Sequence, residues 1–172
     1  MNILITGKIG AGKTIVCKKI AERLKSKGHE VFGFLTFPII ESGRRVGFYI
    51  VGVKSGERTV LAKEYEEGME GQRLKNYIFS LDGIEFGIRA LNDGGDVCFV
   101  DEIGLLELRG KGFFKAIQKP ANCKDLIVTA RTKFAAEVKK LFAIDFKMVE
   151  VTASNRDSLP QTILQCLSIW GK

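Results

Sequence analysis

The segment Gly7–Thr14 constrains the fold of this chain more than any other part of the sequence. It reads GKIGAGKT and fits the pattern G-x-x-x-x-G-K-[ST], in which glycines let the backbone turn its N–H groups toward a bound anion. An apolar run at residues 2–6 precedes the segment. The stretch 13–27 follows it and repeats apolar residues every four positions, as a helix does. Strand, loop and helix in this order predict an α/β fold with a phosphate-binding loop.

The rest of the chain alternates strand and helix patterns, which indicates βα units on a mainly parallel sheet. Turn residues at 41–43 and 54–57 predict an antiparallel hairpin insertion that interrupts this sheet. We expect the stretch 64–72 to be a mobile loop, and Asp82 to cap its own helix. The expected strands are 2–6, 31–37, 45–53, 58–62, 77–79, 96–100, 126–129 and 146–151, and the expected helices are 13–27, 82–92, 113–118, 133–142 and 157–169.

Size and composition narrow the class of protein. A length of 172 residues predicts a single domain, 1–172. No apolar run reaches the roughly 18 residues of a membrane span, and we expect a cytoplasmic protein with no membrane partner. The four cysteines lack the Cys-x-x-Cys spacing of a metal site and are expected to be reduced and mostly buried, Cys98 among them.

The net charge of +7 favours partners that carry phosphate, although a solvated helix face produces the same count. Nucleic acid is an unlikely partner on this reading, because the sequence shows no interleaving of aromatic and basic residues that would stack bases. The sequence leaves the oligomeric state open.

The loop residues have separate expected tasks. Lys13 would reach the β- and γ-phosphates of a nucleotide, and Thr14 would place its hydroxyl on Mg²⁺, a cation that prefers oxygen ligands. Lys8 either adds positive charge or points to solvent. The predicted nucleotide-binding residues are Gly7, Lys8, Ile9, Gly10, Ala11, Gly12, Lys13, Thr14 and Arg156.

A second acidic site follows the apolar strand at 96–100. Asp101 stands at its carboxyl end, where ligands of α/β sheets gather, and is predicted to hold Mg²⁺ together with Thr14. Glu102 is then placed to accept a proton from the attacking water, that is, to act as a general base. The alternative is that Glu102 is a surface carboxylate that merely follows the metal-binding aspartate. Lys13 and Glu102 are therefore the predicted catalytic residues.

Beyond these single sites, the chain resembles the family of small cancer-related nucleoside-triphosphatases along most of its length. The segment Asp101–Leu108, DEIGLLEL, is similar to the family's Asp-Glu-Ile-Gly-x-x-Glu-Leu stretch. Further similar segments are Gly33–Thr36, Arg45–Phe48, Ser55–Glu57 and Thr152–Asp157. The resemblance implies the three-layer P-loop NTPase fold. It also implies Mg²⁺-dependent hydrolysis of ATP and GTP, with CTP and UTP as further substrates, at modest rates and with little base selectivity.

The sequence departs from the family pattern at two places. Leu105-Leu106 replaces the usual Lys-Met, so a cation near the metal site is missing. The stretch Thr36–Ile40, TFPII, replaces a Thr-Glu-x-Val-Arg run. These differences concern the rate and the substrate contacts at those positions and leave the triphosphate site intact.

Three further residues have two interpretations each. Glu107 either orients the metal-bound water or is the polar side of a loop. Arg131 and Arg156 each follow a strand and would act as an arginine finger at the γ-phosphate, or are exposed loop residues.

Two other functions use the same loop. A small-molecule kinase needs an acceptor pocket and commonly an arginine-rich lid, and residues 63–75 offer only Lys63, Arg73 and Lys75 among four glutamates. A nucleotide-switched binding module would need no fast turnover.

Overall fold

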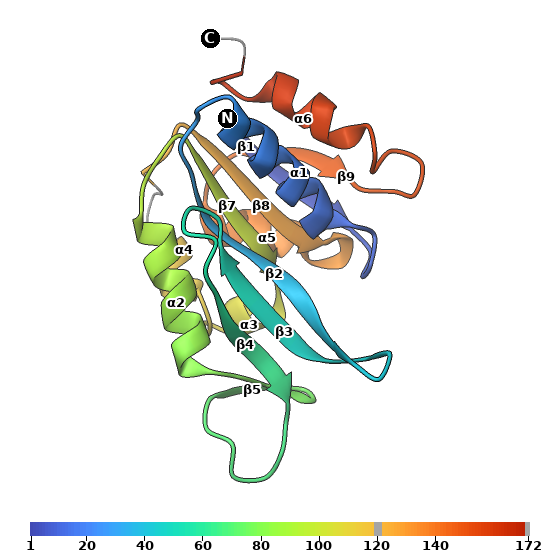
Figure 1. Ribbon diagram of the computed structural model, residues 1–172, viewed down its shortest axis with the longest axis vertical. Helices are drawn as coiled ribbons and strands as arrows, with labels where there is room; N and C mark the ends of the chain where they lie inside the picture. The colour runs from blue at the N-terminus through green and yellow to red at the C-terminus, as the bar shows by residue number, and fades with distance from the viewer. Residues whose placement is uncertain (119–121, 171–172) are drawn as a thin grey trace.

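The computed structural model describes residues 1–118 and 122–170. Its strands form one sheet in the order β5-β6-β4-β3-β2-β7-β8-β1-β9. The strands are β1 (Asn2–Gly7), β2 (Val31–Glu41), β3 (Arg44–Gly52), β4 (Arg58–Glu64), β5 (Gln72–Leu74), β6 (Tyr77–Phe79), β7 (Val97–Ile103), β8 (Asp125–Arg131) and β9 (Lys147–Glu150). The helices are α1 (Lys13–Ser26), α2 (Leu81–Asn92), α3 (Leu105–Leu108), α4 (Phe114–Ile117), α5 (Ala135–Phe142) and α6 (Leu159–Cys166), with a 3₁₀ turn η1 (Thr132–Phe134) (Figure 1).

The sheet has a parallel half and an antiparallel half. Strands β9, β1, β8, β7 and β2 pair in parallel, so their carboxyl ends share one edge. Strands β3, β4, β6 and β5 continue the sheet beyond β2 in antiparallel order. The predicted α/β class is confirmed. The predicted antiparallel hairpin insertion is also confirmed, because β2, β3 and β4 pair in antiparallel order. Its strands do not divide the parallel half, as an interruption of the sheet would, but extend the sheet beyond β2.

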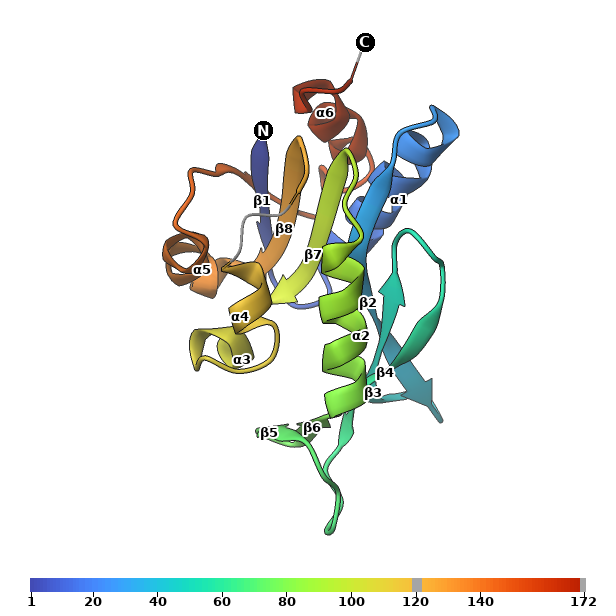
Figure 2. The same ribbon diagram turned by 90° about the vertical axis from the view of Figure 1, so that its left-hand side faces the viewer.

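Helices cover both faces of the parallel half and make three layers (Figure 2). Helices α1 and α6 lie on one face, and α2, α4 and α5 lie on the other. Side chains of the central strands alternate between two cores: Ile3 and Ile5 of β1 join the α1 core, whereas Leu4 joins the α2 core. Cys98 of β7 is fully buried in the second core, as predicted. None of the described helices is long and apolar enough to cross a membrane.

Several predicted helices begin or end elsewhere. Helix α2 is capped by Ser80, whose hydroxyl accepts a hydrogen bond from the Gly83 N–H at 3.0 Å; the expectation that Asp82 caps the helix is wrong. The stretch 133–142 divides into η1 and α5, and the stretch 157–169 is helical only in α6, whose first turn holds Pro160 as expected.

Short elements were the hardest to predict. Strand β5 begins at the last residue of the expected loop 64–72 and pairs with β6, and α3 follows β7 where no helix was expected. Strand β9 is two residues shorter than predicted, as it covers 147–150 instead of 146–151, and α4 covers 114–117 instead of 113–118. The expected strand at 77–79 is confirmed as β6. Other elements of three or four residues were missed or misplaced because so few residues carry little periodicity.

Candidate active site

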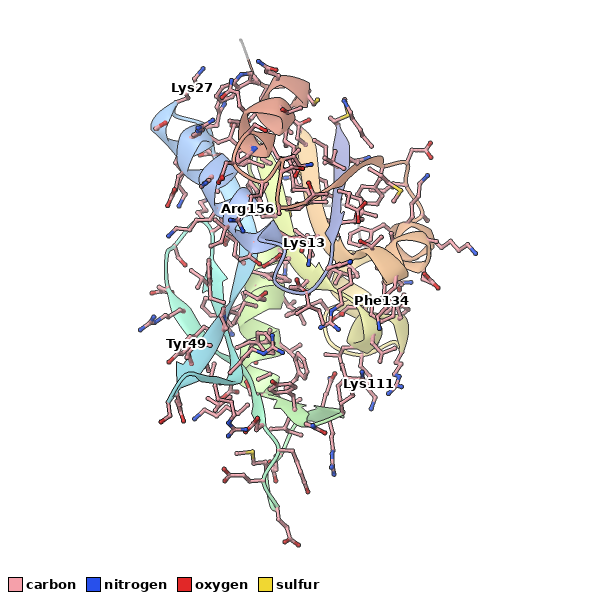
Figure 3. The ribbon with its side chains drawn as sticks, turned by 90° about the vertical axis from the view of Figure 1, so that its right-hand side faces the viewer. Lys13, Lys27, Tyr49, Lys111, Phe134 and Arg156 are labelled. Carbon is pink, nitrogen blue, oxygen red and sulfur yellow. The ribbon has the colours of Figure 1, made fainter. Side chains whose placement is uncertain are left out.

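The phosphate-binding loop connects β1 to α1 at the carboxyl edge of the parallel strands. Gly10 and Gly12 adopt left-handed backbone conformations, with φ of 76° and 100°, which glycine adopts without strain. Lys13 is almost fully buried in the first turn of α1, and its ammonium donates to the carbonyl oxygens of Gly7 (3.4 Å) and Lys8 (3.3 Å). Figure 3 shows Lys13 near the middle of the molecule, where the strand ends meet. The Lys8 side chain is exposed, and Ile9 is 60% exposed at the tip of the loop.

Asp101 lies beside the loop and is 2% exposed. Its Oδ2 accepts hydrogen bonds from the Thr14 hydroxyl (2.8 Å), the Thr36 N–H (2.9 Å) and the Thr36 hydroxyl (3.0 Å). Its Oδ1 accepts from the Thr129 hydroxyl at 2.5 Å. The predicted pair of Asp101 and Thr14 is therefore in contact. Sequence reasoning missed Thr36 and Thr129; the available signal was a threonine that directly follows the apolar run of each neighbouring strand.

The charge of Asp101 has no cationic partner among the described side chains, since all its hydrogen-bond donors are neutral. Burial raises the pKa of Asp101, and the nearby charge of Glu102 raises it further. The threonine hydrogen bonds act in the opposite direction. A buried carboxylate and a hydroxyl 2.8 Å apart form an oxygen donor set that fits a small divalent cation such as Mg²⁺.

Glu102 leaves the regular strand ladder. The pairing of β7 with β8 shifts between Val100 and Ile103, and Glu102 adopts a left-handed backbone with φ of 56°, which is uncommon for a residue with a side chain. The Glu102 N–H donates to the Thr129 hydroxyl at 2.8 Å. This conformation brings Glu102 Oε1 to 3.1 Å from the Lys13 ammonium. Backbone strain of this kind concentrates at functional sites.

The two candidate arginines both lie near the phosphate-binding loop, but they come from different segments of the chain. Arg131 ends β8 and pairs in register with Gly7, so it stands beside the start of the loop and is half-buried. Arg156 is exposed in the turn after β9, and a Cβ placed on Gly12 would come within 3.9 Å of its Cδ. Figure 3 shows Arg156 above Lys13. The Asn155 side chain shapes this turn by accepting from the Thr152 N–H at 2.9 Å.

Glu107 is 3% exposed, so the interpretation as the polar side of a loop is wrong. Its carboxylate accepts from the Gly104 N–H (3.1 Å) and the Phe113 N–H (3.3 Å) and so ties α3 to the start of α4. No described hydrogen bond or ion pair joins it to Asp101 or Glu102. Burial raises the pKa of Glu107 to about 7, against the lowering effect of these backbone hydrogen bonds. At the first departure from the family pattern, Leu106 is buried and Leu105 is half-buried.

Comparisons with known proteins agree with this geometry. A family model described as NTPase matches residues 2–164. The nucleoside-triphosphatase THEP1 of Methanopyrus kandleri is 34% identical over 98% of this chain and 96% of its own length. The cancer-related nucleoside-triphosphatase homologue of Mus musculus is 30% identical over 92% of each chain.

Solved structures show the same fold. The solution structure of a human cancer-related nucleoside triphosphatase covers 99% of both chains with a TM-score of 0.79 and 30% identity. The crystal structure of THEP1 from Aquifex aeolicus covers 98% of this chain and 99% of its own, with a TM-score of 0.67 and 27% identity. The resemblance noted in the sequence is thereby confirmed, and the chain belongs to the nucleoside-triphosphatase family.

Proposed function

We propose that this nucleoside-triphosphatase hydrolyses Mg²⁺-bound nucleoside triphosphates to the diphosphate and phosphate, with Glu102 activating the attacking water. ATP, GTP, CTP and UTP are the proposed substrates. The observation that carries the proposal is the contact of Glu102 Oε1 with the Lys13 ammonium at 3.1 Å, beside the Thr14–Asp101 pair. A cytoplasmic location stays a prediction from the sequence.

Thr14 and Asp101 would hold the metal ion, Asp101 directly or through water. When bound, Mg²⁺ would neutralise charge on the phosphate oxygens. The Lys13 ammonium would supply a second positive charge to the β- and γ-phosphates, and the N–H groups of the loop would cradle them. Arg156 is proposed to contact the nucleotide, and either Arg156 or Arg131 would stabilise charge that develops on the γ-phosphoryl group.

The Lys13–Glu102 ion pair suggests an order of events. A triphosphate in the loop would compete with the Glu102 carboxylate for the ammonium, because phosphate oxygens carry more charge. Glu102, one third exposed, would then be free to accept a proton from water. The water oxygen bonds to the γ-phosphorus as the bond from that phosphorus to the bridging oxygen breaks, and the diphosphate leaves with that electron pair.

Glu102→Gln tests the proposed general base. The amide keeps the size of the side chain but cannot take the proton, so turnover should fall by roughly 10²- to 10⁴-fold. Nucleotide affinity should stay the same or rise, because the competing negative charge on Lys13 is gone. Single-turnover hydrolysis measures the first quantity and equilibrium titration with labelled nucleotide measures the second. Turnover within a few-fold of wild type would place water activation elsewhere.

The two other candidate functions predict different results in the same assay. A kinase would release little phosphate until a nucleoside or another small acceptor is added. A nucleotide-switched module would hydrolyse slowly until its partner is present. The relatives that match this chain are named nucleoside-triphosphatases, which favours hydrolysis over both.

A further inference from the structure

The antiparallel half of the sheet is covered by a helix on one face only. Helix α2 packs on β3 and β4 from one side (Figure 2). On the opposite face α1 lies beside β2, and Figure 1 shows no helix in front of β3 and β4. Cross-strand pairing of Phe37 with Tyr49 and of Val51 with Arg58 places these four side chains on the face opposite α2. Figure 3 shows Tyr49 on the outer side of β3, away from Lys13.

A groove of about 410 Å³ runs between α1 and this face. Its floor is apolar and includes Leu35, Phe37, Val51 and Val53. Three charged side chains of α1 border it on the helix side: Lys18, Glu22 and Lys25. Phe37 and Val51 belong both to the groove and to the surface around Tyr49, so the two are continuous.

Positive charge exceeds negative charge around the groove. Lys18 and Lys25 face one acid, Glu22, which lies 3.8 Å from Lys18, and the Lys25 ammonium donates to the Val53 carbonyl. The Arg58 guanidinium lies 4.8 Å from the centre of the Tyr49 ring and adds a third cation. These residues come from α1, β3 and β4, so the sequence shows no interleaved pattern although the folded chain brings aromatic and basic side chains together.

We propose that the groove and the adjoining Tyr49–Arg58 surface bind single-stranded nucleic acid. Bases would stack on Phe37 and Tyr49, which are half-buried on the sheet face that α2 does not cover, while Lys18, Lys25 and Arg58 contact the phosphates. Charge favours this occupant over a second copy of the chain, because each copy carries +7 and repels the other, whereas a polyphosphate backbone is attracted. The surface shares no residue with the proposed hydrolytic site.

Fluorescence anisotropy with a labelled oligouridylate of about 12 nucleotides tests this surface. The wild-type protein should bind, and binding should weaken as salt rises. Tyr49→Ala should weaken binding by roughly 10- to 100-fold, the range for loss of one stacked base, while Tyr49→Phe keeps the ring and should bind like wild type. Arg58→Ala should lower the salt slope by about one, because one phosphate contact is lost.

The control variant is Arg89→Ala, which removes another exposed arginine, from α2 on the covered side of the sheet. It should leave both the affinity and the salt slope unchanged. All four variants should hydrolyse ATP at the wild-type rate, so failure of the hydrolytic mechanism and failure of this proposal are separable. If Tyr49→Ala folds poorly by circular dichroism, Arg58→Glu carries the test and should weaken binding more than Arg58→Ala.

Four results would overturn the proposal. The first is no binding of the oligouridylate by the wild-type protein at low salt. The second is an equal loss of affinity in Arg58→Ala and Arg89→Ala, which would mean diffuse charge attraction. The third is equally tight binding of a blunt duplex, which cannot stack its bases on Tyr49. The fourth is a dimer in sedimentation that dissociates in Tyr49→Ala, which would assign the face to a second copy.

Discussion

Two adjacent carboxylates, Asp101 and Glu102, stand in different surroundings. Asp101 is enclosed by hydroxyl and N–H donors, whereas Glu102 turns out of the strand and reaches Lys13. In a regular strand, consecutive side chains already point to opposite faces of the sheet. The left-handed backbone at Glu102 does more, because it takes this residue out of the regular pairing of β7 with β8. One acid is therefore suited to hold a metal ion and the next to accept a proton.

Asp101→Asn should raise the Mg²⁺ concentration for half-maximal hydrolysis by about 10- to 100-fold, because an anionic oxygen becomes neutral. Titration of activity with MgCl₂ measures the change. The fold should survive, since an uncharged amide is cheaper to bury than a carboxylate without a cation. Normal activity with an unchanged Mg²⁺ requirement would remove Asp101 from the metal site.

Glu107 should make stability depend on pH near neutrality. Its pKa is raised from 4.5 to about 7 in the folded protein, so between these values the folded state binds more protons than the unfolded state. The free energy of unfolding therefore falls as pH rises through this window, by about 3 kcal/mol in all. Asp101, whose pKa is also raised, acts in the same direction.

Urea unfolding at several pH values measures this effect. Glu107→Gln should lose a large part of the pH dependence that wild type shows, because the amide does not titrate. Glu137→Gln, which changes an exposed glutamate of α5, serves as the control and should keep it. Parallel pH curves for wild type and Glu107→Gln would show that Glu107 does not titrate in this range.

At the scale of elements, α2 covers one face of the antiparallel half and positions its strands. Ser80 joins this helix to the sheet: its hydroxyl accepts from Gly83 and donates to the Val60 carbonyl of β4 at 2.9 Å. Gly87 lets the helix approach closely, because a Cβ there would lie 2.5 Å from the Phe113 ring. In the described part of the chain, α2 is the helix that packs on β3 and β4. The opposite face of these two strands is therefore left open.

Ser80→Ala should reduce the free energy of unfolding by about 1 to 2 kcal/mol, since both the cap and the bond to β4 are lost. Asp82→Ala removes an acid from the same first turn without removing the cap, and should cost less than about 1 kcal/mol. Thermal or urea unfolding of the two variants measures the difference. A larger loss of unfolding free energy in Asp82→Ala than in Ser80→Ala would show that Asp82, and not Ser80, caps the helix.

At the scale of the whole molecule, the phosphate-binding loop follows directly on a strand that contributes to both hydrophobic cores. β1 lies between β8 and β9, sends side chains into both cores, and ends at Gly7. A ligand on the loop therefore contacts the end of a strand that packs in both cores. Nucleotide binding should for this reason stabilise the protein globally.

Magnesium with a non-hydrolysable ATP analogue at 100 times its Kd should raise the free energy of unfolding by about 2.7 kcal/mol. Calorimetry measures the accompanying rise in Tm. Lys13→Ala should lose most of this rise, and to a similar extent for ATP and GTP analogues, because Lys13 is proposed to contact phosphate and not the base. A much larger loss for one base than for the other would contradict that placement.

Much of the candidate site was readable in the sequence because its parts are local. The loop Gly7–Thr14 and the pair Asp101-Glu102 each occupy consecutive residues, and their chemistry follows from residue type, spacing and the strand before them. Alternation of strand and helix patterns was sufficient to predict the parallel half of the sheet. The two residues that these patterns assigned to one metal site, Thr14 and Asp101, are hydrogen-bonded to each other in the structure.

The remaining features depend on contacts between segments far apart in the chain. Thr36 and Thr129 meet Asp101 only because β2, β7 and β8 are neighbours in one register, and Glu107 is buried only because α3 folds against α4. Tyr49, Arg58 and Lys18 likewise come from three elements. The sequence alone determined the chemistry of the phosphate loop and its acids, because adjacent residues carry it. The tertiary structure decided which other side chains surround them, because packing and strand register set distances that no local pattern encodes.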